Sequence, residues 1–169
     1  MEYVQLVDER DNVLGAMEKL AAHRGAHLHR AVSVFVFNSK GELLLQQRAA
    51  HKYHSGALWT NTCCTHPRPQ EAHAHAALRR LKEEMGLSAS LNYQFPFLYR
   101  AALDHELTEY EYDHIYFAES DALPEPNPEE VMNYSYLSLS DIELQMKHTP
   151  EAYTEWFKLL FDRIKIARS

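Results

Sequence analysis

The sequence has only two cysteines, Cys63 and Cys64, and they are neighbours in the chain. Adjacent cysteines close no loop, so the fold cannot depend on a framework of disulfides. No apolar run approaches the roughly 18 residues that a membrane span needs. Residues 1–5 also lack the basic start and the apolar stretch of a secretory signal. We therefore expect a cytoplasmic protein without a membrane partner.

Positive charge is scarce as well, since 17 Lys and Arg residues face 24 Asp and Glu residues and the net charge is −7. This balance argues against a nucleic-acid-binding protein, which normally carries a basic patch. An anionic small molecule remains a candidate ligand, because a few local basic residues can outweigh a global negative charge. No repeat and no domain boundary interrupts the chain, so we expect a single domain over residues 1–169.

Hydrophobic patterning predicts a mixture of strands and helices without a regular βαβ repeat. Strands are expected at residues 3–7, 13–17, 31–37, 42–48, 97–102, 107–118 and 131–137. A helix is expected over Glu71–Met85, because prolines precede it and Gly86 follows it. A short helix should open with a capping box at Ser140. A last helix should have Thr149 as its N-cap and Pro150 at its first position.

The expected buried faces of the two longer helices follow from apolar spacing of three or four residues. The first helix should bury Ala74, Leu78, Leu81 and Met85. The last helix has a longer stripe, made of Tyr153, Trp156, Phe157, Leu160, Phe161 and Ile164. These patterns indicate the α/β class, with a mixed sheet between helices.

The first long helix carries a run of charged residues with defined spacing. Glu71, Arg79, Glu83, Glu84 and Gly86 follow the order E-x7-R-R-L-K-E-E-M-G-L, which resembles the Nudix box that holds magnesium on a diphosphate. Thr65 stands in place of the opening glycine of that box, and Arg80 in place of a glutamate on which Nudix hydrolases depend. An alternative interpretation is a solvated helix face with ion pairs between residues four apart.

A second motif, the segment W-T-N-T-C-C-T-H-P at residues 59–67, lies just before the box. Taken singly, Cys64 could be a small buried residue and His66 a loop histidine. The whole run resembles the W-T-N…C-x-H-P signature of type 1 isopentenyl-diphosphate isomerases, which belong to the Nudix superfamily. The resemblance implies a Nudix-type α/β/α sandwich that interconverts isopentenyl and dimethylallyl diphosphates. The alternatives are a Nudix pyrophosphohydrolase and a non-catalytic metal-binding homologue.

The same resemblance implies one divalent metal ion, held by three histidines and two glutamates. Its ligands would be His23, His29, His66, Glu109 and Glu111, and His27 competes with His29 for one position. Residues i and i+2 of a strand share a face, so Glu109 and Glu111 could bind one ion, although such a pair can also lie on an exposed face. Imidazole and carboxylate ligands leave manganese, zinc and magnesium open.

The resemblance also implies roles for residues that would meet the substrate. The expected catalytic residues are Cys64, Glu111 and Tyr99. The expected diphosphate-binding and substrate-binding residues are Lys19, Arg48, Lys52, Arg80 and Trp156, with magnesium bridging the diphosphate to Glu84. Tyr99 could instead pack within a strand and Trp156 within the core. The partner would be a small isoprenoid diphosphate, and the chain would be a monomer or a weak homodimer.

Overall fold

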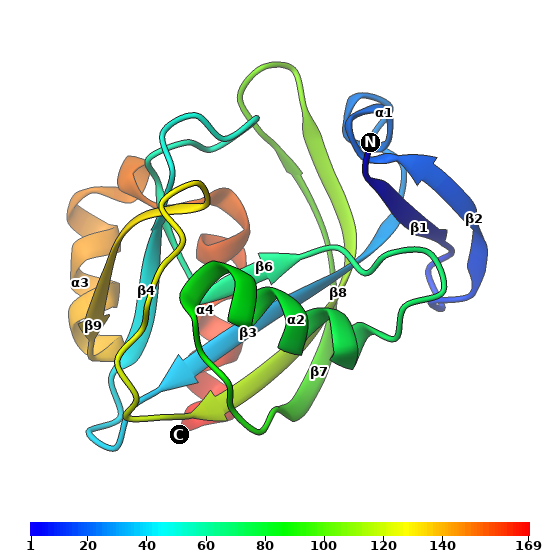
Figure 1. Ribbon diagram of the computed structural model, residues 1–169. Coiled ribbons are helices and arrows are strands. Elements are labelled where there is room, and N and C mark those ends of the chain that lie inside the picture. The colour runs from blue at the N-terminus through cyan, green and yellow to red at the C-terminus, as the bar shows by residue number, and fades with distance from the viewer.

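The computed structural model describes residues 1–169 and contains one mixed sheet of nine strands with helices on both faces (Figure 1). In chain order the strands are β1 (Tyr3–Val7), β2 (Val13–Glu18), β3 (His29–Phe37), β4 (Leu43–Arg48), β5 (Trp59–Thr60), β6 (Cys63–Thr65), β7 (Asn92–Ala102), β8 (Thr108–Glu119) and β9 (Val131–Leu137). The helices are α1 (Lys19–Arg24), α2 (His73–Met85), α3 (Leu139–His148), the 3-10 turn η1 (Pro150–Ala152) and α4 (Glu155–Arg168). The expected α/β class is confirmed.

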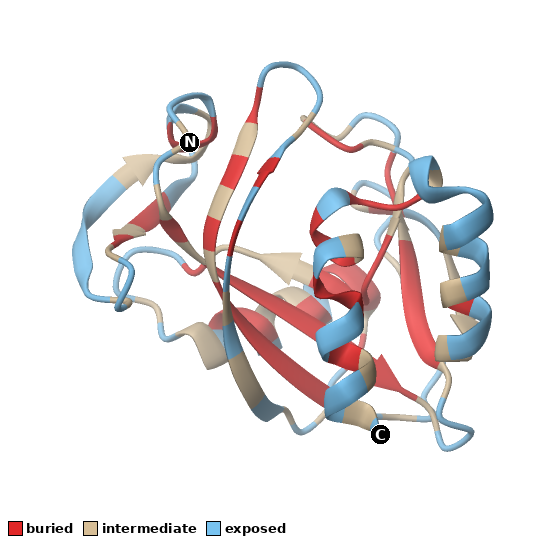
Figure 2. Ribbon diagram, turned by 180° about the vertical axis from the view of Figure 1, so that it is seen from behind, coloured by how far each residue is buried: buried red, intermediate tan, exposed pale blue.

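Two apolar layers fill the space between the sheet and its helices. Because side chains alternate along a strand, β3 sends Val32, Val34 and Val36 to the face that α2 covers. It sends Phe35 and Phe37 to the opposite face, where α3 and α4 pack. Figure 2 shows buried residues along the central strands and exposed residues on the outer sides of the helices. The core therefore lies on both faces of β3.

Strand β3 is the axis of the sheet. One edge pairs in parallel with β8 over its whole length, from His29 opposite Glu111 to Phe37 opposite Glu119. The other edge is shared by three strands in turn: β1 at His29, β6 at residues 32–34 and β4 at Phe37. No strand pairs with residues 30–31 of β3 on this edge, between the β1 pairing at His29 and the β6 pairing at residues 32–34, so the sheet is open there. The site described below lies in this opening.

The N-terminal hairpin forms one wall of the opening, and it leads into a short helix that the sequence patterns did not predict. Strands β1 and β2 pair as expected, and α1 follows directly. The Glu18 carboxylate accepts hydrogen bonds from the backbone N–H groups of Leu20 and Ala21, so it caps the helix. Residues 19 and 23 are one turn apart on this helix and therefore share a face.

Helix α2 begins two residues later than expected, at His73, and presents a somewhat different face. Leu78 is 43% exposed, so its expected place in the buried stripe is wrong. Ala77 and Glu84 point inward instead, next to Leu81. Glu71 precedes the helix, where its carboxylate accepts two hydrogen bonds from the Arg79 guanidinium, at 2.8 and 2.9 Å.

Gly86 ends α2 in the left-handed conformation, with a φ of 66°. A side chain here would also meet the Glu125 backbone oxygen at 2.8 Å. Glycine is therefore needed at this position both for the backbone angle and for the close approach of the following loop.

Two of the expected helix starts are wrong by a few residues. Helix α3 is capped by Ser138, whose side chain accepts a hydrogen bond from the Asp141 N–H, and not by Ser140. Pro150 opens η1 rather than the last helix, and Thr149 makes no side-chain cap there. The last helix starts at Glu155 with Thr154 as its N-cap. All six residues predicted for the buried stripe of the last helix are buried, although Tyr153 lies before the helix and only Trp156 to Ile164 belong to it.

The expected strands are confirmed with small shifts at their ends, and β5 and β6 are additional. Strand β7 starts at Asn92, earlier than expected, because its first residues still pair with β8. No helix combines the length and the apolar character needed to cross a membrane.

Candidate active site

Four histidine rings converge at the open end of the sheet. His23 comes from α1, His29 from the start of β3, and His66 from the segment after β6, and their ring centroids lie 4.9 to 5.4 Å apart. The fourth ring belongs to His54, in the loop after β4, with its centroid 5.7 Å from that of His23. Sequence motifs predicted the first three, and the structure brings them together.

Local hydrogen bonds orient these rings. The Nδ1 atom of His23 lies 2.7 Å from the Lys19 carbonyl oxygen, and that of His29 lies 2.8 Å from the His27 carbonyl oxygen. Both Nδ1 atoms must donate to these carbonyls, which leaves the lone pair on each Nε2 free. Residue 27 is exposed and contributes its backbone, so the structure places His29 in the cluster and His27 outside it.

The donor atoms of this cluster fit a divalent metal ion. His23, His29 and His66 each offer a ring nitrogen, and Glu111 offers a carboxylate oxygen, all within 4.8 Å of one another. Ligands of one ion lie at most about twice a metal–ligand distance of ~2.0–2.2 Å apart, so the spacing is close to that of one coordination sphere. The Nε2 atoms of His23 and His29 are buried without a hydrogen-bond partner. Unpaired buried nitrogens are costly unless something binds them.

Burial also keeps two of these rings, His23 and His66, uncharged. It lowers the pKa of His66 to about 3, with the neighbouring histidines adding to the effect and Glu111 opposing it. Burial lowers the pKa of His23 as well, followed by the effect of His29. A metal ligand must be a neutral imidazole, so these two rings are in the form that coordination requires.

The two glutamates of the expected ligand set come from β8 and share one face of it. The Tyr99 hydroxyl, on the adjacent β7, contacts both carboxylates, with its oxygen 2.7 Å from Glu109 Oε2 and 2.6 Å from Glu111 Oε2, and donates its one proton to one of them at a time. Glu111 Oε1 lies 2.9 Å from His66 Nε2 and 3.3 Å from His29 Nε2. Glu109 points elsewhere and groups with His23 and His54. The structure therefore divides the expected ligand set into two overlapping groups.

The two carboxylates have opposite proton affinities. Burial and then the charge of Glu111 hold the pKa of Glu109 well above its usual range. Burial acts in the same direction on Glu111, but the close approach of the His29 and His66 rings outweighs it and holds the pKa of Glu111 well below its usual range. Glu111 is thus the carboxylate that can accept a proton.

Cys64 lies on β6, on the side of β3 that faces away from β8. Its thiol donates to Asn61 Oδ1 at 3.0 Å and accepts from Trp156 Nε1 at 3.1 Å. Burial, and next the charge of Asp113, raise the pKa of the Cys64 thiol, so it holds its proton at neutral pH. Cys63 points to the other face, into the apolar layer under α2.

A cavity of about 530 Å³ lies beside Cys64, His66 and Glu111. The four basic side chains that were expected to bind phosphate also line this cavity. Three are paired with carboxylates: Lys19 with Glu2, Lys52 with Glu130, and Arg80 with Glu83, Glu84 and Glu130. Arg48 is buried beside the Trp156 ring, with its guanidinium carbon 5.3 Å from the ring centroid, and its Nε atom has no partner. The structure brings all four to one cavity with Cys64 and Glu111.

Glu84 lies on α2 at a different part of this cavity. Its carboxylate accepts from Gln46 at 2.9 Å and from Arg80 at 2.7 Å. It belongs to neither histidine group.

Three buried polar residues of the site carry no motif and were missed in the sequence. His54 is one of them. The others are Ser33 on β3 and Asp113 on β8, joined by a 2.7 Å hydrogen bond from Ser33 Oγ to Asp113 Oδ2. Ser33 is also 3.8 Å from Cys64 Sγ. The only sequence signal was that Asp113 stands two residues after Glu111 and so shares its face of the strand.

Comparison with known proteins agrees with this geometry. The model of the NUDIX domain matches residues 27–157. Among solved structures, one from Deinococcus radiodurans superposes with a TM-score of 0.82 at 23% identity, covering 96% of this chain and 98% of that one. The MutT protein of Methanosarcina mazei superposes with a TM-score of 0.68 at 20% identity, covering 82% and 93%. At these identities the likeness concerns the fold.

Curated relatives are closer in sequence. An isopentenyl-diphosphate Delta-isomerase of Pectobacterium atrosepticum is 53% identical over 161 residues, which is 95% of this chain and 90% of the relative. Isopentenyl-diphosphate Delta-isomerase 1 of Aromatoleum aromaticum is 47% identical over 167 residues, which is 99% and 94% of the two chains. The chain belongs to the Nudix family and, within it, to the isopentenyl-diphosphate Delta-isomerases.

Proposed function

We propose that the protein interconverts isopentenyl diphosphate and dimethylallyl diphosphate by adding one proton and removing another. The observation that carries this proposal is the joint placement of Cys64 and Glu111 at one cavity, on strands that flank β3 from its two sides. The names of relatives that are about half identical along nearly the whole chain support the same reaction.

The reaction needs an acid and a base on two sides of a flat five-carbon unit. Protonation of C4 of isopentenyl diphosphate leaves a positive charge at the tertiary C3, and loss of a proton from C2 then gives dimethylallyl diphosphate. The Cys64 thiol and the Glu111 carboxylate are the proposed pair, assisted by the Tyr99 hydroxyl that contacts Glu111. Because the reaction is reversible, each group gives and takes a proton in turn. General acid–base groups contribute ~10²–10⁴-fold each.

The carbocation between the two proton transfers needs protection and stabilisation. The indole of Trp156 donates a hydrogen bond to the Cys64 sulfur and lines the cavity, so its ring would lie near a carbon skeleton bound beside Cys64. An aromatic face over a desolvated cation stabilises it by roughly 2 kcal/mol. The buried walls of the cavity keep water away from the cation, which water would otherwise trap.

A metal ion at the histidine cluster would be held by His23, His29, His66 and Glu111, with Glu109 next to them. When bound it supplies a fixed positive charge that orients Glu111 and tunes its proton affinity. Manganese, zinc and magnesium are the candidate ions. A separate magnesium ion is proposed to bridge the substrate diphosphate to Glu84.

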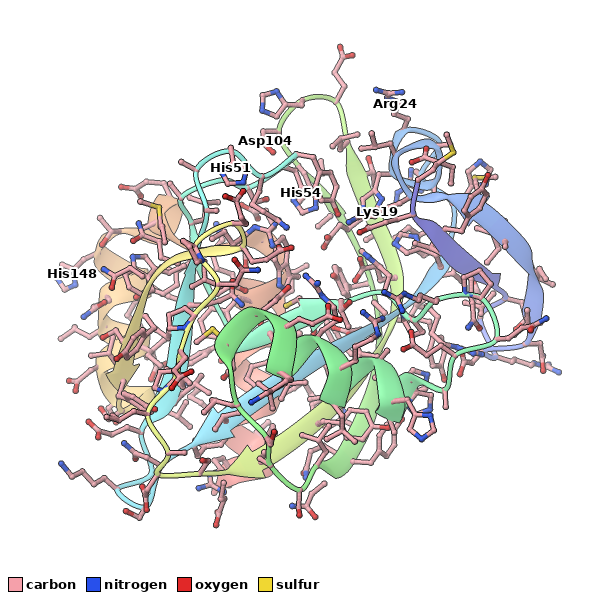
Figure 3. All side chains as sticks on the ribbon, viewed as in Figure 1. Lys19, Arg24, His51, His54, Asp104 and His148 are labelled. Carbon is pink, nitrogen blue, oxygen red and sulfur yellow. The ribbon has the colours of Figure 1, made fainter.

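The diphosphate is proposed to bind among Lys19, Arg48, Lys52 and Arg80. Arginine grips phosphate with two parallel hydrogen bonds, and lysine acts as a point charge. The carboxylates paired with Lys19, Lys52 and Arg80 would release these three cations to the more highly charged substrate. Figure 3 shows Lys19 and His54 directed toward the same space, between the loop after β4 and α1, whereas Arg24 and His148 point away from it.

The rival function is a Nudix pyrophosphohydrolase, and Arg80 argues against it. Hydrolysis needs a carboxylate that accepts a proton from water at this position, and a guanidinium cannot accept one. Isomerisation leaves the diphosphate intact and uses it only for binding, and a cation such as Arg80 is suited to bind it. A non-catalytic metal-binding homologue would leave Cys64, Trp156 and the basic cavity without a common purpose.

Incubation with isopentenyl diphosphate in heavy water tests the function. We expect dimethylallyl diphosphate and incorporation of deuterium into the recovered diphosphates, with no release of phosphate from these or from nucleoside diphosphate derivatives. Phosphate release without deuterium incorporation would show that the protein is a pyrophosphohydrolase and not an isomerase. If neither phosphate nor deuterium-labelled diphosphate is formed, the protein would be a non-catalytic metal-binding homologue.

The setting of this function is part of the proposal. We propose that residues 1–169 act as one domain in the cytoplasm, as a monomer or a weak homodimer, with no nucleic-acid or membrane partner. The negative net charge of −7 supports the exclusion of nucleic acid.

A further inference from the structure

Asn61 is a fully buried residue between β5 and β6, three positions before Cys64. Its amide nitrogen Nδ2 donates to two backbone carbonyl oxygens, those of Val34 at 3.1 Å and Cys63 at 2.9 Å. Carbonyl oxygens accept hydrogen bonds and cannot donate them, so the amide can be oriented in one way only. The amide oxygen Oδ1 therefore faces the other side, where Cys64 lies.

Two side chains donate to this amide oxygen. The Cys64 sulfur lies 3.0 Å from Asn61 Oδ1, and the Thr60 hydroxyl oxygen lies 2.9 Å from it. Because an amide oxygen cannot donate, the Cys64 thiol must direct its proton at Asn61. The sulfur in turn accepts from the Trp156 indole, whose Nε1 lies 3.1 Å away and can only donate. The thiol is thus held from two sides, as a donor and as an acceptor.

These contacts belong to a closed ring of side-chain hydrogen bonds that starts and ends at α4. Thr154, the N-cap of α4, donates to the Thr60 hydroxyl at 2.9 Å, because Thr60 uses its own proton on Asn61. From Asn61 the ring runs through the Cys64 sulfur to Trp156, in the first turn of α4. Four of the five side chains are at most 2% exposed, so water does not compete for these bonds. The ring fixes the sulfur relative to both the sheet and the indole.

We propose that Asn61 is the positioning residue of the Cys64 thiol, which it holds at the cavity wall in a fixed relation to the Trp156 indole. This inference rests on the proposed function, in which Cys64 exchanges a proton with a substrate carbon. A group misplaced by about 1 Å can slow a reaction about 10²-fold, because the reacting atoms must approach in one geometry. Ser33 cannot replace Asn61, because its hydroxyl lies 3.8 Å from the sulfur and donates to Asp113.

The test compares two substitutions that keep the size of Asn61, made in the whole chain. Asn61→Leu removes every hydrogen bond of the amide. Asn61→Asp keeps an oxygen at the place of Oδ1, and burial keeps its carboxyl protonated, so it can still donate to one backbone carbonyl. Thr62→Val is the matched control for the loss of buried hydrogen bonds. The Thr62 hydroxyl is fully buried in the same segment and bonds only to the backbone of β3 and β4.

The readouts are steady-state kinetics and the S–H stretching bands in the infrared spectrum. A thiol that donates a hydrogen bond absorbs at a lower frequency than a free thiol, because the bond weakens its S–H stretch. The chain has only two cysteines, so the Cys64 band is the one that Cys64→Ser removes. Cys63 lies in the apolar layer under α2, and its band is the internal reference.

We expect Asn61→Leu to raise the frequency of the Cys64 band and to lower kcat about 10–100-fold, with KM within about 3-fold of the wild type. Asn61→Asp should keep the low frequency and most of kcat. Thr62→Val should lose stability and change neither readout. Circular dichroism checks that all variants are folded. If Asn61→Leu does not fold, Asn61→Ser, whose hydroxyl is too short to reach the sulfur, must show the same two changes.

Turnover like that of the wild type in Asn61→Leu overturns the proposal, and so does a fall in turnover without a shift of the Cys64 band. It is also overturned if Asn61→Asp keeps the band and loses as much turnover as Asn61→Leu, because the amide would then act only through its bonds to the backbone. In these cases an active wild type leaves the proposed function intact. A wild type that incorporates no deuterium into isopentenyl diphosphate refutes the function itself, and the role of Asn61 with it.

Discussion

Two side chains at the cavity are expected to carry the proton transfers, and each can be changed with little change in shape. Cys64→Ser replaces a thiol by a much weaker acid, and Glu111→Gln replaces a carboxylate by an amide that cannot accept a proton. We expect turnover of isopentenyl diphosphate to fall at least ~10²-fold in each variant. Steady-state kinetics is the measurement.

The matched control is Cys63→Ser, because Cys63 faces the apolar layer under α2 and not the cavity. It should lose some stability and keep most of its turnover. Far-UV circular dichroism should show that all three variants are folded. Turnover like that of the wild type in Cys64→Ser or Glu111→Gln would sink the assignment of that residue.

Arg80 differs from most of its helix neighbours in facing the cavity. Arg80→Glu removes a cation and adds a fourth carboxylate to the group of Glu83, Glu84 and Glu130. We expect KM for isopentenyl diphosphate to rise about 10–100-fold, since a hydrogen bond to a charged group is worth about 1.5–3 kcal/mol. Phosphate release should stay absent. Lys82→Glu makes the same charge change on an exposed side of α2, and its KM should stay near that of the wild type.

At the scale of a single element, the start of α4 depends on one hydroxyl. Thr154 Oγ1 accepts from the Phe157 N–H at 3.4 Å and contacts Thr60 Oγ1 at 2.9 Å, in a fully buried position. Thr154→Ala should lower the free energy of unfolding by about 1–2 kcal/mol, the usual cost of an N-cap. Thr149→Ala, at the cap expected from the sequence, should change it by less than ~0.5 kcal/mol. Urea unfolding of both variants decides between the two caps.

The same comparison shows where sequence patterns reach their limit. Several residues that could cap a helix often stand within a few positions of one another, as Ser138 and Ser140 do. Contacts made in the folded protein then decide which of them is the actual cap. Thr154 is selected because Thr60 meets it, and Thr60 is far away in the chain. Long apolar elements were predictable, because the continuous apolar run of β3 indicates a strand buried on both faces and the stripe of α4 specifies one face. The six residues of α1 and the short β5 and β6 carry no such period.

A pair of stacked histidines joins α2 to the sheet away from the cavity. The rings of His73 and His114 lie parallel, with centroids 3.8 Å apart, and Tyr116 and Asp11 contact their outer nitrogens at 2.7 and 2.9 Å. Burial, then the positive charges of His114 and Arg30, lower the pKa of His73 to about 4. The unfolded chain binds this proton near pH ~6.5. Stability from this residue is therefore complete above that pH and lost as the pH falls towards 4.

His73→Asn should reduce the loss of thermal stability between pH 6.5 and 4, because asparagine can accept from Tyr116 and binds no proton. His75→Asn changes an exposed histidine of the same helix and should follow the wild-type curve. Differential scanning calorimetry across this pH range is the measurement. Parallel curves for wild type and His73→Asn would contradict the role given to the stacked pair.

At the scale of the whole molecule, the histidine cluster connects four separate parts of the chain. His23, His29 and His66 were predictable because a family motif marks each of them. His54 was not, because nothing in a loop sequence tells which of its side chains turns inward when the sheet forms. The division of Glu109 from Glu111 was equally hidden, since strand alternation places both on one face and says nothing of which neighbour each one meets.

The parallel pairing of β3 with β8 has a consequence for the order of events in folding. It places His29 opposite Glu111, so the cluster is complete only after two strands far apart in the sequence have met. Contacts over such long separations form slowly and late. A metal ion that needs both strands stabilises the native state more than the transition state, so it should slow unfolding and leave the folding rate almost unchanged.

Stopped-flow folding and unfolding in denaturant, with saturating zinc and with a chelator, measures both rates. We expect the unfolding limb to shift downward with zinc by about 100-fold, equivalent to ~2.7 kcal/mol at a free concentration 100 times the dissociation constant. A folding limb accelerated by zinc would mean that the ligands gather before the strands pair. With the ion in place, this enzyme would owe its persistence to a high barrier against opening, so chelation would shorten the lifetime of the folded chain without hindering its formation.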